Sequence, residues 1–227
     1  MKLKKEFKDF YDAICIHEES EDLKEKRDIL QKDVKDKFPD EMKKHDIDLK
    51  KSEIEMFDQG SYKYSTTIRS SVIDRDVAVM IPLDIEEYPD PRKIKGYLRD
   101  AVNHVAARTV KIKEPCVNVS YYENGEEWMH IDLPLYAKHD DKVYLARGKE
   151  FATQYSWEVA DPKGLNDDLC NRINKNEQLR RVIRYIKKWR NEKYKNSTLD
   201  HEVPPSIGLT YLACDCFVSS TTSEGED

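Results

Sequence analysis

Residues 74–81 read Asp74-Arg75-Asp76-Val77-Ala78-Val79-Met80-Ile81, so two carboxylates lead directly into an apolar run. The apolar run predicts a buried strand over Val77–Leu83. Because side chains alternate between the faces of a strand, Asp74 and Asp76 should point the same way. Paired carboxylates at the mouth of an apolar strand repel each other unless a cation lies between them. Magnesium, a hard ion that takes oxygen ligands, fits this position.

Two further features place this pair in a chemical context. The turn at Gly60-Ser61 lies upstream and can offer backbone N–H groups to phosphates. Asp132 lies downstream in an apolar stretch, where an acidic side chain is costly to bury without a partner. Nucleotidyl transfer needs two metal ions about 4 Å apart, and three carboxylates from neighbouring strands can hold them. Together, Gly60-Ser61 and the three aspartates predict nucleotidyl transfer.

Composition limits the class of protein. The chain has 227 residues, enough for one large or two small domains, and its 37% charged residues predict a soluble globular protein. The longest apolar run is far too short to span a bilayer, and no secretory signal is expected at the N-terminus. The net charge of -6 argues against a partner such as long nucleic acid, but it is compatible with a local basic cleft for nucleotides.

The cysteines indicate the compartment. Their number is odd and no CxxC pair occurs, which argues against zinc and against a disulfide framework. We therefore expect reduced thiols in a cytoplasmic protein. The cysteines are Cys15, Cys116, Cys170, Cys214 and Cys216.

The first sixty residues predict helix followed by a polar connection. Apolar residues recur at three- and four-residue steps up to Phe38, and we expect the helix to end before Pro39. Residues 39–60 then look like a polar connection. They contain a second Asp-x-Asp, Asp46-Ile47-Asp48, which lies among lysines without an apolar strand behind it. This second pair is predicted to be a surface charge cluster.

From residue 61 to 136 the pattern is α/β. A short helix or turn follows Ser61, and an amphipathic helix with an apolar stripe from Ile94 to Ala106 follows the first strand. Two further strands are expected around Cys116–Tyr122 and Trp128–Tyr136. They are joined through Asn124-Gly125, the strongest short signal for a hairpin.

From about residue 161 the chain is again predicted to be helical. One helix contains Leu179 to Trp189, and a second begins near Pro204-Pro205-Ser206, with Ser206 close to its cap. The tail, residues 219–227, is polar and is expected to be disordered. Lys187 and Ser206 could bind phosphates as a cation and a hydroxyl donor. Taken alone, they would be interpreted as a solvated lysine and a helix cap. Only their position after the three aspartates in the chain supports a role in phosphate binding.

Other chemistries lack a fingerprint in the sequence. Neither a P-loop motif nor GxGxxG occurs. The histidines show neither a metal-ligand spacing nor a partnered nucleophile; they are His17, His45, His104, His130, His139 and His201.

The order Gly60-Ser61, Thr67, Asp74-x-Asp76 and Asp132 resembles that of the DNA polymerase β-type nucleotidyltransferase superfamily. Within it, the chain is similar to the CD-NTases, the bacterial cyclic-oligonucleotide synthases related to cyclic GMP-AMP synthase and oligoadenylate synthase. The supporting segments are residues 157–165, 181–190 and 205–212, and the resemblance covers roughly residues 55–217.

The resemblance implies an α+β fold: a polymerase β-type lobe with a mixed sheet and helices, a helical lobe and a long N-terminal helix. The implied domains are residues 1–160, 161–218 (truncated relative to the family) and the tail. By resemblance, the aspartates would hold two Mg²⁺ ions and the other site residues would bind the donor triphosphate. The implied metal ligands are Asp74, Asp76 and Asp132; the implied triphosphate ligands are Gly60, Ser61, Lys187 (or the adjacent Lys188) and Ser206.

The resemblance also implies an activity. Nucleoside triphosphates (ATP, with GTP, UTP or CTP as further substrates) would be condensed into a cyclic di- or trinucleotide. This second messenger would be sensed by an effector protein in bacterial antiphage defence. Two alternatives stay open: transfer of a nucleotide to an RNA, small-molecule or protein acceptor, and a non-catalytic nucleotide-binding module.

Overall fold

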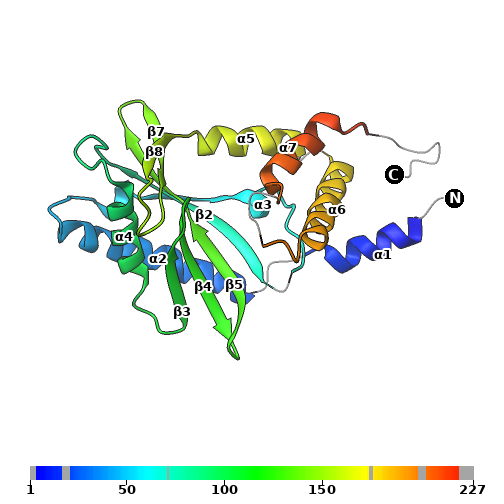
Figure 1. The fold of residues 1–227 in the computed structure, drawn as a ribbon, viewed down its shortest axis with the longest axis horizontal. Helices are drawn as coiled ribbons and strands as arrows, with labels where there is room; N and C mark the ends of the chain where they lie inside the picture. Colours follow the sequence, from blue (N-terminus) through cyan, green and yellow to red (C-terminus); the bar gives the residue numbers. More distant parts are fainter. Residues whose placement is uncertain (1–3, 17–20, 71, 174–175, 199–202, 220–227) are drawn as a thin grey trace. The chain divides into compact units, whose positions relative to one another are not determined.

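The computed structural model describes residues 4–16, 21–70, 72–173, 176–198 and 203–219 (Figure 1). The chain divides into two compact units, each formed by segments that are discontinuous in sequence. The sheet unit comprises Glu19–Gln59 and Ser71–Pro162, and the helical unit comprises Met1–Glu18, Gly60–Ser70 and Lys163–Asp227. Across the described ranges, no helix is both long enough and apolar enough to cross a membrane.

The sheet unit is built on one mixed sheet (Figure 1). Its strand order is β3-β4-β5-β2-β6-β7-β8, and β1 pairs with β2 outside this path. β2 runs parallel to β5 and β6 and antiparallel to β1. The strands are β1 (Glu55–Gln59), β2 (Ile73–Pro82), β3 (Arg108–Ile112), β4 (Val117–Glu123), β5 (Glu126–Leu133), β6 (Leu135–His139), β7 (Lys142–Arg147) and β8 (Ser156–Val159).

The strands confirm part of the sequence prediction and correct the rest. β2 begins at Ile73, earlier than expected, so both aspartates of the first pair lie inside the strand. The single strand expected over Trp128–Tyr136 is two strands, β5 and β6, interrupted at Pro134, which has no N–H to donate to a ladder. The hairpin at Asn124-Gly125 is confirmed, with φ of 53° and 84° at its two residues. The prediction of a polar connection over residues 39–60 is wrong for Glu55–Gln59, which form β1.

Two helices cover one face of the sheet. α2 (Glu21–Lys43) and α4 (Pro91–Val102) bury their apolar stripes against alternate residues of the central strands (Figure 1). α4 ends before Val105, shorter than predicted. α2 continues through Pro39 to Lys43, so the predicted end before Pro39 is wrong. A 3₁₀ helix, η1 (Lys51–Glu53), follows α2, and between them Asp46 and Asp48 are exposed, which confirms the prediction of a surface cluster.

The helical unit has its own core. It contains α1 (Lys4–Ile14), α3 (Gly60–Lys63), α5 (Pro162–Ile173), α6 (Glu177–Lys193) and α7 (Ser206–Cys216). Tyr64 packs into this core, and its hydroxyl donates to Asn166 Oδ1 at 2.7 Å, which ties the Gly60–Ser70 segment to α5. The predicted disordered tail lies, from residue 220 onward, outside the described residues.

Candidate active site

Side chains alternate between the two faces of the sheet, so that one face is apolar and the other is polar. Odd-numbered residues of β2 such as Val77 and Val79 lie in the core with α2 and α4. The even-numbered residues point to the opposite face, as expected for Asp74 and Asp76. Strand register then sets two polar rows across β4, β5 and β2. One row is Ser120–His130–Asp74, and the other is Asn118–Asp132–Asp76.

The three predicted aspartates therefore lie on one face of two adjacent strands. Asp76 is the register partner of Asp132, and Asp74 is the register partner of His130. One carboxylate oxygen of Asp74, one of Asp132 and a ring nitrogen of His130 all lie within 4.8 Å of one another. Such a group could hold a metal ion. His130 was not among the site residues predicted from the sequence.

Asp132 is held by polar neighbours. The amide Nδ2 of Asn118 donates to its Oδ1 at 2.6 Å, and Lys113 Nζ lies 3.9 Å from the same oxygen. These groups supply the partner that an acidic residue in an apolar strand needs. Burial, followed by the negative charge of Asp132, raises the pKa of the Cys116 thiol. Cys116 is therefore a neutral thiol beside the site.

His130 is a charged partner of Asp74. Its Nε2 lies 3.1 Å from Asp74 Oδ1, and this hydrogen bond raises the pKa of His130 above its ordinary value. Arg75, although it separates the two aspartates in sequence, points to the other face. Its guanidinium is 2% exposed and donates to Asp58 at 2.9 Å. The cation next to the carboxylates in sequence thus does not share their face.

The remaining predicted residues lie in the helical unit. Gly60 has φ of 66°, a left-handed conformation that glycine adopts readily, and begins α3. Ser61 Oγ lies 3.3 Å from Thr67 Oγ1, so the two hydroxyls of the expected motif meet. Ser206 is the first residue of α7 with Pro205 at the cap position, and its carbonyl accepts from Thr210 Oγ1 at 2.9 Å.

The structure separates Lys187 from Lys188. Lys187 is buried, and its Nζ donates to Thr66 Oγ1 at 3.0 Å and to the Thr66 carbonyl at 3.2 Å. Lys188 forms an ion pair with Glu192 within its own helix at 2.8 Å. Of the two lysines, Lys187 is therefore the one that faces the segment carrying Gly60 and Ser61. The phosphate-binding role of these residues remains a prediction.

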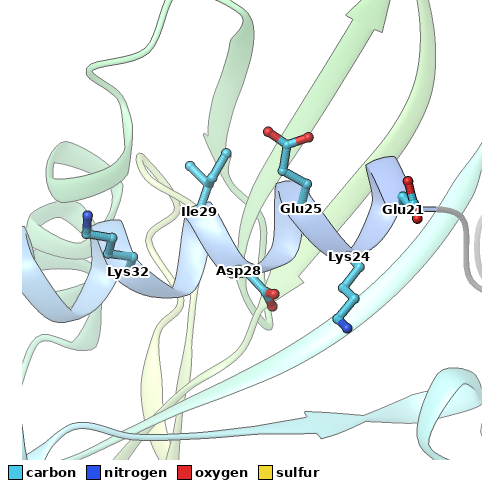
Figure 2. A pocket seen from close by; sticks show the side chains of 6 residues that line it. All are labelled: Glu21, Lys24, Glu25, Asp28, Ile29 and Lys32. Carbon is cyan, nitrogen blue, oxygen red and sulfur yellow. The ribbon is translucent and has the colours of Figure 1, made fainter.

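A second surface feature lacks the character of an active site. Figure 2 shows a pocket along α2 in the sheet unit, and the six residues that line it come from this single helix. Five are charged and spaced along the helix surface, so no groups from different elements converge there. The lining residues are Glu21, Lys24, Glu25, Asp28, Ile29 and Lys32.

Comparisons with known proteins find related sequences. Residues 54–136 match the family model described as the nucleotidyltransferase domain of cyclic GMP-AMP synthase DncV-like proteins. The chain is 29% identical over 192 residues to a cyclic GMP-AMP synthase of Escherichia albertii. This alignment covers 74% of the chain but 41% of that relative, so the chain spans less than half of the relative's length. Both matches support the resemblance to the CD-NTases.

Solved structures confirm the fold. Vibrio cholerae DncV cyclic AMP-GMP synthase superposes with a TM-score of 0.66 at 20% identity, over 92% of this chain and 70% of that chain. The 3'-deoxy GTP bound form of Escherichia coli DncV gives a TM-score of 0.69 at 19% identity, with coverage of 92% and 70%. These similarities confirm the polymerase β-type nucleotidyltransferase fold that the sequence resemblance implied.

Proposed function

We propose that this chain is a metal-dependent nucleotidyltransferase that condenses nucleoside triphosphates into a cyclic di- or trinucleotide. The observation that carries the proposal is the placement of Asp74, Asp76 and Asp132 on one face of β2 and β5. The similarity to DncV-like nucleotidyltransferase domains and to a cyclic GMP-AMP synthase supports the same activity. Structures of Vibrio cholerae DncV are described with a linear intermediate pppA(3',5')pG and with GTP. The product would act as a second messenger for an effector protein in antiphage defence.

The donor chemistry of the site fits magnesium. Carboxylate oxygens are the ligands that Mg²⁺ takes, and Asp74, Asp76 and Asp132 would hold two ions. When bound, such ions lower the pKa of an attacking hydroxyl and neutralise triphosphate charge. Asn118 restrains Asp132 through the 2.6 Å hydrogen bond, so that this carboxylate keeps a fixed orientation during the reaction.

The chain's other residues would bind and orient the donor nucleotide. Backbone N–H groups at Gly60 and Ser61 would contact its triphosphate. Lys187 and Ser206 would bind the β and γ phosphates through an ammonium and a hydroxyl group. In the reaction, a ribose hydroxyl oxygen attacks the α-phosphorus of the donor. A phosphodiester bond forms, the bond to the β-phosphate oxygen breaks, and pyrophosphate leaves.

Incubation with α-³²P-labelled ATP, GTP, CTP and UTP and Mg²⁺, singly and mixed, tests this proposal. A phosphatase-resistant product that is lost in Asp74→Asn and Asp76→Asn is the expected result. The matched control changes the other Asp-x-Asp, as Asp46→Asn with Asp48→Asn, and should keep the activity, because both residues are exposed between α2 and η1 and lie outside β2 and β5.

Other outcomes identify the alternatives. Label that appears only on added RNA, a small molecule or a protein would replace the cyclic product with transfer to another acceptor. Calorimetry that shows ATP binding without Mg²⁺ dependence, unchanged in Asp74→Asn, would replace catalysis with a nucleotide-binding module.

A further inference from the structure

His130 lies between two carboxylates on the polar face of the sheet unit. Its Nε2 is 3.1 Å from Asp74 Oδ1, and its Nδ1 is 3.0 Å from Glu127 Oε1. The side chain is 21% exposed, so most of the ring is buried. Both ring nitrogens therefore have a defined direction, one toward the carboxylate site and one away from it.

A β-bulge places Glu127 beside His130. Tyr121 pairs with Met129, but Tyr122 pairs with Glu127, so Trp128 is the extra residue on β5. Without the bulge, Glu127 would share the odd-numbered apolar face with Met129. The extra residue shifts the alternation and turns Glu127 to the polar face, as bulges commonly do near active sites.

The contacts around Glu127 are those of a ligand-orienting carboxylate. A histidine that binds a metal usually donates its second ring N–H to a carboxylate, which fixes the tautomer and the ring orientation. Here Glu127 accepts from Nδ1 and also from Ser120 Oγ at 2.9 Å. Ser120 is itself buried, which anchors Glu127 to β4. With Nδ1 occupied as a donor, Nε2 is the ring atom that faces the carboxylate site. It donates a hydrogen bond to Asp74 when no ion is bound, and an ion that binds there would displace this proton and take the nitrogen lone pair.

The distances allow coordination at that edge. Two neighbouring ligands of an octahedral ion with bond lengths near 2.1 Å lie about 3 Å apart. The separation of His130 Nε2 and Asp74 Oδ1, 3.1 Å, matches this value. The oxygen of Asp132 completes a group whose members lie within 4.8 Å of one another. An imidazole ligand favours first-row transition ions over Mg²⁺, which takes oxygen ligands.

We propose that His130 is a nitrogen ligand of a divalent ion shared with Asp74 and Asp132, with Glu127 as its positioning residue. The site would thereby bind a first-row transition ion more tightly than Mg²⁺. This inference rests on the proposed function, because it assigns a ligand to the same metal site. The nitrogen ligand would add a preference for transition ions over Mg²⁺ that the oxygens of three carboxylates alone would not give.

Pulsed electron paramagnetic resonance of Mn²⁺ bound to the full chain tests the ligand directly. We expect ¹⁴N modulation from a coordinated imidazole, and we expect ¹⁵N-histidine labelling of the wild-type chain to replace it with the ¹⁵N pattern. Because labelling changes no residue, this readout is independent of whether a variant folds. His130→Gln should remove the coupling and lower Mn²⁺ affinity about 10- to 100-fold, with Mg²⁺ affinity nearly unchanged.

Two variants separate ligation from general structure. His139→Gln changes another strand-borne histidine near a carboxylate, 3.5 Å from Asp84, and should leave the signal intact. Glu127→Gln should lower Mn²⁺ affinity about tenfold and weaken the ¹⁴N coupling, since the ring loses its orienting carboxylate.

The outcomes distinguish this inference from the proposed function. Mn²⁺ binding that is lost in Asp132→Asn but shows no ¹⁴N coupling in the wild type would overturn it, because the ion would then have only oxygen ligands. Mn²⁺ binding unchanged in both Asp74→Asn and Asp132→Asn would overturn the metal site itself. A persistent ¹⁴N coupling without any nucleotide product would support the ligand and count against nucleotidyl transfer alone.

Discussion

Lys95 provides the sharpest test of what holds the strands of the site in place. Its side chain is fully buried on α4, and its Nζ donates to the carbonyls of Lys113 at 3.0 Å, Glu114 at 2.8 Å and Gly148. Lys113 and Glu114 form the turn that leads into β4, the strand that carries Asn118. The lysine thus joins a helix under the sheet to the entry of a strand that positions Asp132.

Lys95→Met keeps most of the apolar volume and removes the three hydrogen bonds. All three carbonyls lose this donor, but the Glu114 carbonyl keeps the backbone N–H of Gly148 at 3.0 Å. An acceptor left without its partner costs about 1–3 kcal/mol. Burying a neutral side chain in place of an ammonium group recovers part of this cost. We expect the free energy of unfolding to fall by about 2–4 kcal/mol.

Urea unfolding followed by circular dichroism and tryptophan fluorescence measures this loss. The matched control is Lys93→Met, an exposed lysine on the same helix, which should change stability by less than about 0.5 kcal/mol. If Lys95→Met costs no more than Lys93→Met, the carbonyl contacts do not stabilise the strand entry and the reasoning fails.

Four further predictions follow from individual contacts. Asn118→Ala should lower the rate of nucleotide condensation about 10- to 100-fold while circular dichroism stays unchanged, because Asp132 loses its 2.6 Å restraint; an unaltered rate would remove Asn118 from the site. A thiol reagent should modify Cys216 rapidly and Cys116 only on unfolding, because burial raises the pKa of Cys116; fast labelling of Cys116 in the native chain contradicts this. Phe38→Ala should cost about 3–5 kcal/mol in urea unfolding, because Phe38 is completely buried, whereas Ile29→Ala at a 42% exposed position of the same helix should cost far less; equal costs would contradict the packing. Burial lowers the pKa of Lys95 from 10.5 to about 8, so the unfolded chain binds more protons between these values and stability should rise with pH there; a rise that persists in Lys95→Met would assign it to another group.

The central strand and its neighbours could be predicted because their signals are local. Asp74, Asp76 and the apolar run after them specify both a strand and the face on which the carboxylates lie. The Asn124-Gly125 turn specifies a hairpin, since both residues tolerate positive φ. Asp132 was placed with the other aspartates by its order in the chain, and the register of β2 and β5 confirms that they share a face.

The polar row beside these aspartates could not be predicted, because it depends on the bulge. Extrapolating the hairpin pairing Glu123↔Glu126 without a bulge would set Asn118 opposite Ile131, on the apolar face. The shift at Tyr121/Tyr122 instead sets it opposite Asp132. A local signal for His130 exists in the sequence: it lies two residues before Asp132, and therefore on the same face of one strand.

Long-range burial explains the other differences. Lys187 looks like a solvated lysine on a charged helix, and its burial arises from contact with Thr66, far away in sequence. The strands β7 and β8 have weak apolar patterns, and their pairing next to β6 rather than their composition defines them; β8 is the edge strand. α2 passes through Pro39 because Phe38 and Met42 on either side are both fully buried, so packing outweighs the proline penalty.

The three-aspartate metal site is tested most directly by a crystal structure of the chain with Mn²⁺ and a non-hydrolysable ATP analogue, with the metal located by anomalous scattering. The shared face of the three aspartates predicts metal peaks bridged by oxygens of Asp74, Asp76 and Asp132, with ligand distances of about 2.1 Å. Metal bound elsewhere, or an Asp132 side chain turned away from the other two while nucleotide is bound, would contradict it.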